Sequence, residues 1–194
     1  MSHRSLLFRA LSTTCLVGGL SIVSLGCGPT PAEGPGAKGA EGAEGGGHPL
    51  VGQPAPAFTA EAVTGEGPKT LAEASGKVVI VDFWATYCDP CKKSFPKYQE
   101  LVEQFGGDLA VIGISVDEKG DASKETIEEF AKTTGVKFAL VWDTEKTAAK
   151  AYSPPNMPTS YVIDKAGVVR HVHAKYQVGE EATIAEEVKA LLGK

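Results

Sequence analysis

The pattern of apolar and polar positions changes near residue 50. Just before it, Gly, Pro and Ala dominate; after it, apolar runs alternate with polar segments, as in a folded domain. Residues 77–83 contain an unbroken Val-Val-Ile-Val run. Such a β-branched run predicts a strand that is buried on both faces, in the centre of a sheet. Residues 109–114 predict a second buried strand.

Helical spacing of apolar residues marks the segments between the strands. Residues 88–105 predict a helix that Gly106-Gly107 ends. Ser123 is expected to cap a second helix, which Gly135 closes. Residues 146–152 predict a short helix. A last helix is predicted from the apolar positions Ile184, Val188, Leu191 and Leu192.

Three further strands are predicted in the second half of the chain, at residues 138–142, 159–163 and 168–174. The last two are separated by Lys165-Ala166-Gly167, which predicts a hairpin. Strands that alternate with helices and end in a hairpin indicate an α/β domain with a mixed sheet.

The N-terminal segment has the features of a targeting signal. Arg4 and Arg9 precede an uncharged stretch that reaches residue 26, which is short and polar for a membrane span. Residues 23–27, Val-Ser-Leu-Gly-Cys, resemble a bacterial lipoprotein signal. The resemblance implies that residues 1–26 are removed and that Cys27 is lipidated. Simple secretion or an uncleaved anchor are the alternatives, because Ser24 stands where the pattern prefers Leu.

Residues 27–50 predict a flexible linker between this signal and the domain. Eight of the 23 residues from 28 to 50 are Gly and four are Pro. A segment with so little apolar surface cannot offset its ordering entropy by burial. We therefore expect a signal peptide at residues 1–26, a tether at 27–50 and one folded domain at 51–194, anchored outside the cytoplasm through the lipid.

Charge and cysteine positions narrow the function classes. The net charge is −5, so no basic excess indicates a nucleic-acid partner. Of the four cysteines, Cys15 and Cys27 belong to the N-terminal segment, and only Cys88 and Cys91 lie in the predicted domain. A disulfide-stabilised scaffold would need more pairs.

The sequence Cys88-Asp89-Pro90-Cys91 follows a buried strand and opens a helix. Unpaired N–H groups and about half a positive charge at a helix start stabilise a thiolate. We expect Cys88 to be the exposed nucleophile and Cys91, one turn further, the buried resolving thiol. Pro90 suits the first turn, where no donor is needed.

Two other uses of the cysteine pair are possible. A zinc site usually needs four ligands, and the domain offers only His171 and His173 besides the pair; they share one face of a predicted strand, which is typical of a solvated edge. A purely structural disulfide with so short a loop adds little stability. We expect no metal and no organic cofactor.

Residues 81–91, Val-Asp-Phe-Trp-Ala-Thr-Tyr-Cys-Asp-Pro-Cys, resemble the active-site strand and loop of thioredoxins. Residues 51–58 and the segment at 119–152 resemble the TlpA/ResA-type branch. The resemblance implies a thioredoxin fold, with a mixed central sheet flanked by helices and a helical insertion around 119–152. It also implies a membrane-anchored thiol–disulfide oxidoreductase on the periplasmic face.

The resemblance also implies roles for residues around the cysteines. Asp82 matches the buried acid of thioredoxins; desolvation should raise its pKa, which suits proton exchange with Cys91. Pro158 matches the cis-proline that packs against the cysteines. The residues expected to bind substrate are Trp84, Met157, Pro158 and Thr159, with the backbone of Met157 pairing with a bound peptide.

Departures from the family pattern concern the specific pathway. Members that reduce apocytochrome c often carry Glu at the position of Ser94 and Asn at that of Asp82, so this duty is not expected here. Asp-Pro between the cysteines is closer to the dipeptides of reducing members than to those of oxidising ones. We therefore expect reduction of disulfide-bearing substrate proteins, with electrons from a membrane thiol donor.

Two rival functions share this fold. A peroxiredoxin-like peroxidase needs Thr or Ser three residues before the reactive Cys and Pro seven before it, where this chain has Ala85 and Val81. A non-enzymatic copper-binding or interaction protein would separate its cysteines by three residues and add a distal His, whereas two residues separate them here.

Overall fold

The computed structural model describes residues 47–194. The predicted signal peptide, Cys27 and most of the linker lie outside them. The strands are β1 Glu61–Thr64, β2 Val78–Trp84, β3 Leu109–Ser115, β4 Ala139–Trp142, β5 Thr159–Ile163 and β6 Val169–Ala174. The helices are α1 Asp89–Phe105, α2 Lys124–Thr134, α3 Thr147–Tyr152 and α4 Glu180–Leu192, with a 3-10 turn at Gly106–Asp108.

The six strands form one mixed sheet in the order β1-β4-β3-β2-β5-β6. The strand β2 lies inside it, parallel to β3 and antiparallel to β5. Every residue of β2 and β3 is buried, as their unbroken apolar runs predict. The hairpin of β5 and β6 closes one edge, and β1 closes the other.

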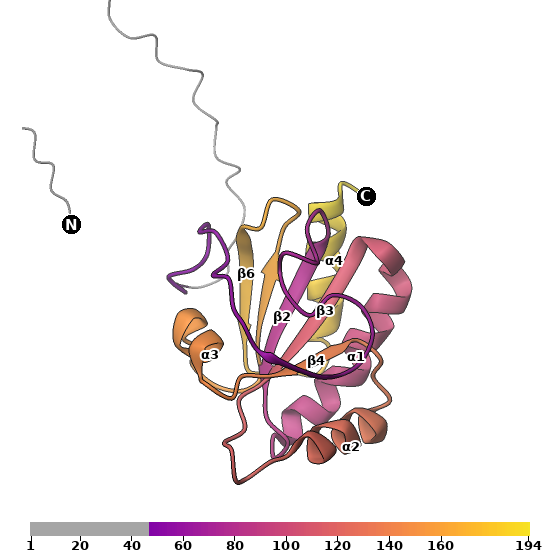
Figure 1. Cartoon of the computed structure of the whole chain (residues 1–194). Coiled ribbons are helices and arrows are strands. Elements are labelled where there is room, and N and C mark those ends of the chain that lie inside the picture. Colours follow the sequence, from indigo (N-terminus) through magenta and orange to yellow (C-terminus); the bar gives the residue numbers. More distant parts are fainter. Residues whose placement is uncertain (1–46) are drawn as a thin grey trace, which may run out of the picture. The chain divides into compact units, whose positions relative to one another are not determined.

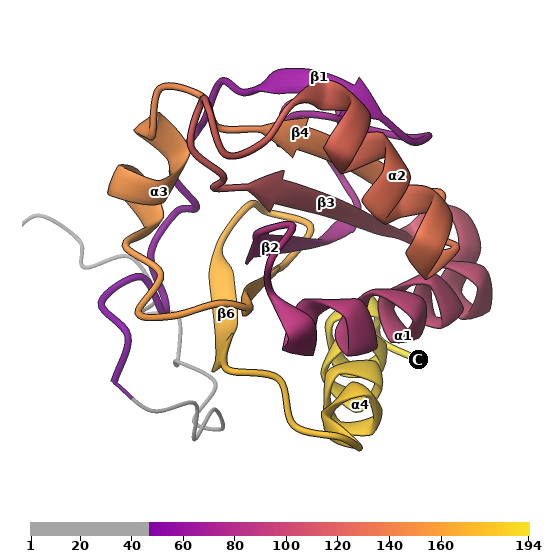
Figure 2. The ribbon, with the colours of Figure 1, turned by 90° about the horizontal axis from the view of Figure 1, so that it is seen from below.

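Helices cover both faces of the sheet, as Figures 1 and 2 show. Apolar residues of α1, α2 and α4 pack on one face, which also contains the two cysteines. The other face is covered by α3 and by the chain that leads into β1, through Tyr152 and Phe58. The predicted α/β fold with a mixed sheet flanked by helices is confirmed, and the segment 119–152 holds α2, β4 and α3.

Local signals set the ends of the helices. The hydroxyl of Ser123 accepts a hydrogen bond from the amide of Thr126, and Gly135 adopts the left-handed conformation that closes α2, as predicted. Gly106 ends α1. The short edge strand β1 was not predicted, because its half-exposed residues show no alternating pattern.

The fold begins slightly before the predicted boundary at residue 51. The ring of His48 packs edge-on against Tyr161, with 5.3 Å between ring centroids, and Leu50 contacts the same apolar cluster. The end of the predicted linker is therefore part of the folded domain.

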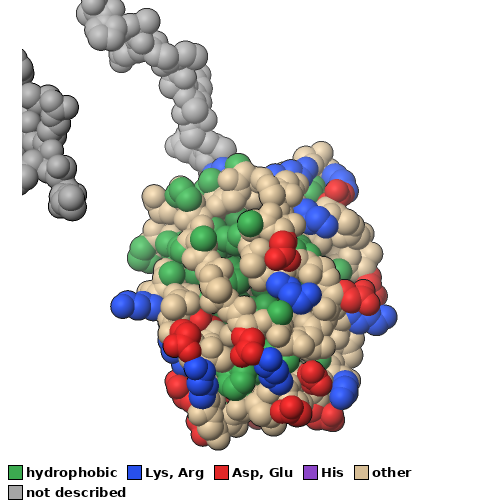
Figure 3. Space-filling view, in the orientation of Figure 1, with side chains coloured by type: hydrophobic (Ala, Val, Ile, Leu, Met, Phe, Trp, Pro, Cys, Tyr) green, Lys and Arg blue, Asp and Glu red, His purple; other side chains and the backbone are tan. Residues whose placement is uncertain are grey.

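On the face seen in Figure 3, charged side chains of both signs lie mainly in the lower and right parts, and apolar side chains gather in the upper left part. No helix between residues 47 and 194 is long and apolar enough to cross a membrane.

Candidate redox site

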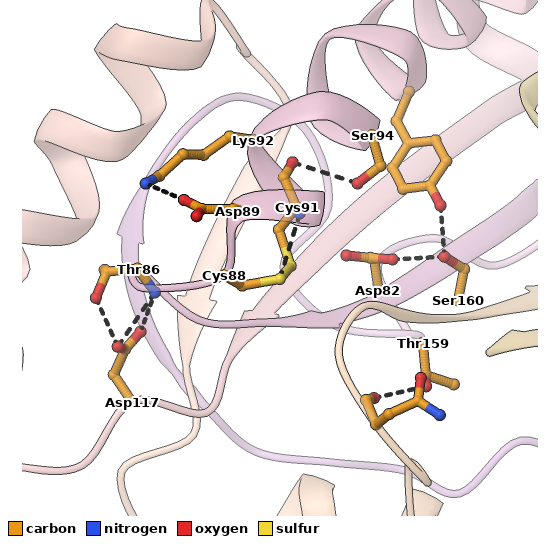
Figure 4. Close-up of a disulfide and its surroundings, with 12 residues drawn as sticks. Asp82, Thr86, Cys88, Asp89, Cys91, Lys92, Ser94, Asp117, Thr159 and Ser160 are labelled. Carbon is orange, nitrogen blue, oxygen red and sulfur yellow. Dashed lines mark hydrogen bonds and ion pairs between the residues drawn. A yellow bond between two sulfur atoms is a disulfide. The ribbon is translucent and has the colours of Figure 1, made fainter. Parts of the chain in front are cut away.

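The two cysteines form a disulfide at the start of α1, with 5.3 Å between their Cα atoms (Figure 4). Cys88 is the N-cap of this helix, and its Sγ accepts a hydrogen bond from the amide of Cys91 at 3.2 Å. Pro90 lies in the first turn. A sulfur at this position receives both a backbone N–H and the positive end of the helix dipole, which favour a thiolate after reduction.

The two sulfur positions differ in access. Cys88 keeps 6% of its surface exposed, whereas Cys91 is fully buried. Next to Cys88, the side chain of Tyr87 is 65% exposed. Cys88 is therefore the more accessible of the two cysteines, although it is far less exposed than the sequence predicts.

Asp89, the residue after Cys88, is neutralised by its neighbour. Lys92 Nζ donates a hydrogen bond to Asp89 Oδ1 at 2.8 Å, and this bond together with the lysine charge lowers the pKa of Asp89. Both side chains are exposed to solvent, so the effect of the pair on stability is small. Its local consequence is that a cation accompanies the carboxylate beside the disulfide.

Asp82 is fully buried in β2, on the sheet face that carries the cysteines. Its Oδ1 accepts a hydrogen bond from Ser160 at 2.5 Å, while Oδ2 has no partner within the described residues. Burial raises the pKa of Asp82 to about 8, against the hydrogen bond from Ser160, which lowers it; the charge of Glu180 adds to the rise. The carboxyl group can therefore gain or lose a proton near neutral pH.

The loop before β5 contacts the same cluster. The peptide bond between Met157 and Pro158 is cis, as the resemblance implied. Met157 packs, half-buried, against the apolar cluster that includes both cysteines. The hydroxyl of Thr159 points inward and donates to the carbonyl of Asn156 at 2.7 Å.

Two of the predicted substrate-binding side chains are inaccessible in this structure. Trp84 is fully buried and packs against Phe130 and Phe95, with ring centroids 4.3 Å and 5.0 Å away. Thr159 is also fully buried. Trp84 and Thr159 belong to the interior strands β2 and β5, so their buried side chains contribute to the packing of the site and not to its surface.

Asp117 is a site residue that the sequence did not reveal. It follows β3, is almost fully buried and accepts hydrogen bonds from the backbone amide and the hydroxyl of Thr86, and from the hydroxyl of Ser115. These bonds fix the loop that precedes Cys88. A carboxylate directly after a buried strand was the available signal.

The histidines of β6 differ from the expected solvated edge. His173 contacts Glu180 through Nδ1 at 3.2 Å and Glu187 through Nε2 at 2.8 Å, and His171 contacts Glu187 at 3.2 Å. The strand β6 is an edge strand, but the prediction that this face is solvated was wrong, because Glu180 and Glu187 of α4 contact the two imidazoles. Among residues 47–194, no group of three or more His, Cys, Asp or Glu side chains is arranged to hold a metal ion.

A thioredoxin-type sheet with a dithiol at a helix start and a buried acid beneath it defines a class of redox proteins, and comparisons with known proteins agree. Residues 51–172 match the AhpC/TSA family. The chain is 32% identical over 122 residues to the thioredoxin-like protein YneN of Bacillus subtilis, covering 63% of this chain and 70% of that protein. It is 34% identical to the thiol-disulfide oxidoreductase ResA of the same organism, covering 61% and 64%.

A solved structure shows the same arrangement. The thiol:disulfide interchange protein of the thioredoxin family from Chlorobium tepidum superposes with a TM-score of 0.60 at 27% identity, over 72% of this chain and 96% of that one. The chain therefore belongs to the AhpC/TSA family, and within it to the thioredoxin-fold thiol–disulfide oxidoreductases that these relatives represent.

Proposed function

We propose that this protein reduces disulfide bonds of other proteins outside the cytoplasm, with Cys88 as nucleophile and Cys91 as resolving thiol. The observation that carries the proposal is the position of Cys88 Sγ at the N-cap of α1, where it accepts the amide of Cys91. A helix N-terminus lowers the pKa of a thiol and keeps a reactive thiolate at neutral pH.

The reaction uses two thiol–disulfide exchanges. The thiolate of Cys88 attacks one sulfur of the substrate disulfide; the other sulfur leaves as a thiolate and takes a proton from water. A mixed disulfide now joins Cys88 to the substrate. Cys91 Sγ loses its proton and attacks Cys88 Sγ, and the second substrate sulfur leaves. Two electrons have passed to the substrate, and the Cys88–Cys91 disulfide has formed.

Asp82 is the base for the second exchange in this proposal. Its free Oδ2 and its pKa of about 8 suit it to take the proton of Cys91, directly or through one water. Exchange in the reverse direction returns the proton. The cis-Pro158 loop supplies the backbone of Met157 for contact with the substrate chain.

The place of action is part of the proposal. The N-terminal sequence supports a signal peptide at residues 1–26 and a lipid on Cys27, with the linker as a tether at the periplasmic face of a membrane. In that compartment the oxidised protein needs re-reduction, and a membrane thiol donor would supply the electrons.

Insulin reduction with dithiothreitol tests the activity. The wild-type domain should accelerate the precipitation of insulin, and Cys88→Ser should abolish the acceleration. Cys91→Ser should instead accumulate a mixed disulfide with substrate, visible on a non-reducing gel. Equal rates with and without Cys88 would refute the proposal.

The direction of the reaction, reduction or oxidation of the substrate, and the two rival functions are tested separately. A reduction potential near that of thioredoxin, about −270 mV, is expected, and a value above about −180 mV would show an oxidant instead. Consumption of hydrogen peroxide would favour the peroxidase, although buried Ala85 supplies no hydroxyl. Stoichiometric copper binding by the reduced domain would favour the non-enzymatic alternative.

A further inference from the structure

A chain of two hydroxyl groups ends on the carboxyl group of Asp82. Ser160 donates to Asp82 Oδ1 at 2.5 Å, and the hydroxyl oxygen of Tyr98 lies 2.6 Å from Ser160 Oγ (Figure 4). Ser160 is the direct neighbour of Asp82 in the register between β2 and β5. All three residues are at most 1% exposed, so bulk water does not compete for these bonds.

The number of protons on the two hydroxyl groups determines which atom donates in each of these hydrogen bonds. A serine hydroxyl has one proton to donate. While Ser160 gives it to Asp82, Ser160 can only accept from Tyr98, so the phenol donates. Both hydroxyls then point their protons towards the carboxylate. Hydrogen bonds aligned in this way strengthen one another in a buried environment.

The two carboxyl oxygens are consequently unequal. Oδ1 already accepts a hydrogen bond from Ser160, whereas Oδ2 has no partner within residues 47–194. A proton that arrives at Oδ2 leaves the bonds to Ser160 and Tyr98 intact. A proton on Oδ1 would require both hydroxyls to turn and would deprive the phenol proton of its acceptor.

We propose that Ser160 and Tyr98 form a positioning pair that keeps Oδ1 of Asp82 as a hydrogen-bond acceptor, so that the carboxyl group exchanges protons with Cys91 through Oδ2. The inference rests on the role of Asp82 in the proposed function. In the second exchange, the proton leaves Cys91 Sγ and binds Oδ2, and the electron pair left on sulfur forms the bond to Cys88 Sγ. The bond between Cys88 and the substrate breaks, and the substrate sulfur leaves as a thiolate.

The other groups around Asp82 do not replace this pair. The register neighbour on β3 is Gly113, which has no side chain to offer. On α1, Tyr98 lies near enough for the charge of Asp82 to raise the pKa of its phenol. From the start of α4, the charge of Glu180 opposes ionisation of Asp82. Within residues 47–194, Ser160 is thus the one hydrogen-bond donor to the carboxylate of Asp82.

The test is the titration of Asp82 in the oxidised full-length protein, followed by the chemical shift of its ¹³C-labelled carboxyl carbon. Asp82→Asn identifies the signal. Ser160→Ala should move the midpoint upward by about one to two pH units, because the anion loses a charged hydrogen bond. Tyr98→Phe removes a single oxygen and should move it in the same direction by less.

Tyr152→Phe is the matched control. It also removes one buried tyrosine hydroxyl, which has no hydrogen-bond partner among residues 47–194 and lies on the opposite face of the sheet, so the midpoint should stay unchanged. The rate of mixed-disulfide resolution should follow the same order, with its pH profile displaced upward in Ser160→Ala.

An unmoved midpoint in Ser160→Ala, or an equal shift in Tyr152→Phe, would overturn the positioning pair and leave the activity of the cysteines standing. A wild-type midpoint near 4 would overturn both the pair and the role of Asp82. Loss of insulin reduction is a separate result, because it depends on Cys88.

Discussion

The carboxylate of Asp117 accepts hydrogen bonds from the backbone amide and from the hydroxyl of Thr86, at 3.0 Å and 2.7 Å. The carboxylate lies at the end of β3 and the bound residue lies two positions before Cys88. Trp142 Nε1 and Lys146 Nζ donate to the carbonyl of Asp117 and hold it from β4 and from the residue that precedes α3. The loop that presents the reactive sulfur is therefore fixed from the neighbouring strand.

Asp117→Ala should destabilise the domain by about 3 kcal/mol, because three donors lose a buried charged acceptor. The measurement is urea unfolding of the oxidised protein. Asp121→Ala, an exposed position a few residues further, is the control and should change stability by less than about 0.5 kcal/mol. Equal stability of the two variants would show that the Asp117 bonds contribute nothing.

Asp82 should make the protein less stable as the pH rises. Its carboxyl pKa is about 8 in the folded state and near the ordinary 3.8 when unfolded. Between these values the unfolded chain has released the proton and the folded one retains it, so the free energy of unfolding falls with rising pH and levels off above about 8. Asp82→Asn removes this loss and should gain a few kcal/mol over wild type at pH 9.

The matching measurement is urea unfolding of both proteins at pH 5 and pH 9. The difference between them should be larger at pH 9. If the gain in free energy of unfolding of Asp82→Asn over wild type were no larger at pH 9 than at pH 5, Asp82 would not be protonated in the folded protein.

Gly113→Ala should disturb the packing around Trp84 and Leu140. An added Cβ would lie 2.6 Å from Leu140 Cδ2 and 3.2 Å from Trp84 Nε1, which is closer than side chains pack. We expect a loss of about 1–3 kcal/mol. Gly107→Ala, which has open space around it, is the control. A variant at position 113 that unfolds at the wild-type urea concentration would contradict the close packing.

We expect His171 and His173 on β6 to change the stability of the domain with pH in opposite directions. Burial lowers the pKa of His173, but its hydrogen bonds and charge interactions with Glu187 and Glu180 outweigh burial and raise it. Its stabilising contribution is complete below the unfolded value near 6.5 and is lost as the pH rises through the folded value. Burial lowers the pKa of His171, so that residue weakens the fold on acidification.

His173→Gln should therefore cost more stability at pH 5.5 than at pH 9, whereas His171→Gln should cost less at pH 5.5 than at pH 9. Thermal unfolding at the two pH values measures both. The same trend in both variants would contradict the assigned charges. Arg170, which also lowers the pKa of His171, stays charged throughout this range.

The sequence predicted most of the fold, because its signals are local. The unbroken apolar run of β2 and the Ser123 and Gly135 caps each determine their own element. The cysteine pair was found from its spacing at a helix start, whereas the role of Asp82 was implied by the resemblance of residues 81–91 to thioredoxins. The strand β1 was not predicted because it is short and half-exposed, and it pairs in the sheet with β4 alone.

The supporting residues of the site could not be predicted from sequence. The contact of Tyr98 with Ser160 joins positions 62 residues apart and depends on the rotation of α1 over the sheet. The contact of Thr86 with Asp117 depends on the register of β2 and β3. A serine or an aspartate has many ordinary uses, and only the three-dimensional neighbours select one.

The central claim is that the helix start activates Cys88, and the pH dependence of its alkylation tests this most directly. The reduced Cys91→Ser variant, treated with iodoacetamide over a range of pH, should show a Cys88 pKa clearly below the value of about 8.5 for a free thiol. Alkylation that follows a free-thiol curve, with a midpoint near 8.5, would contradict the account.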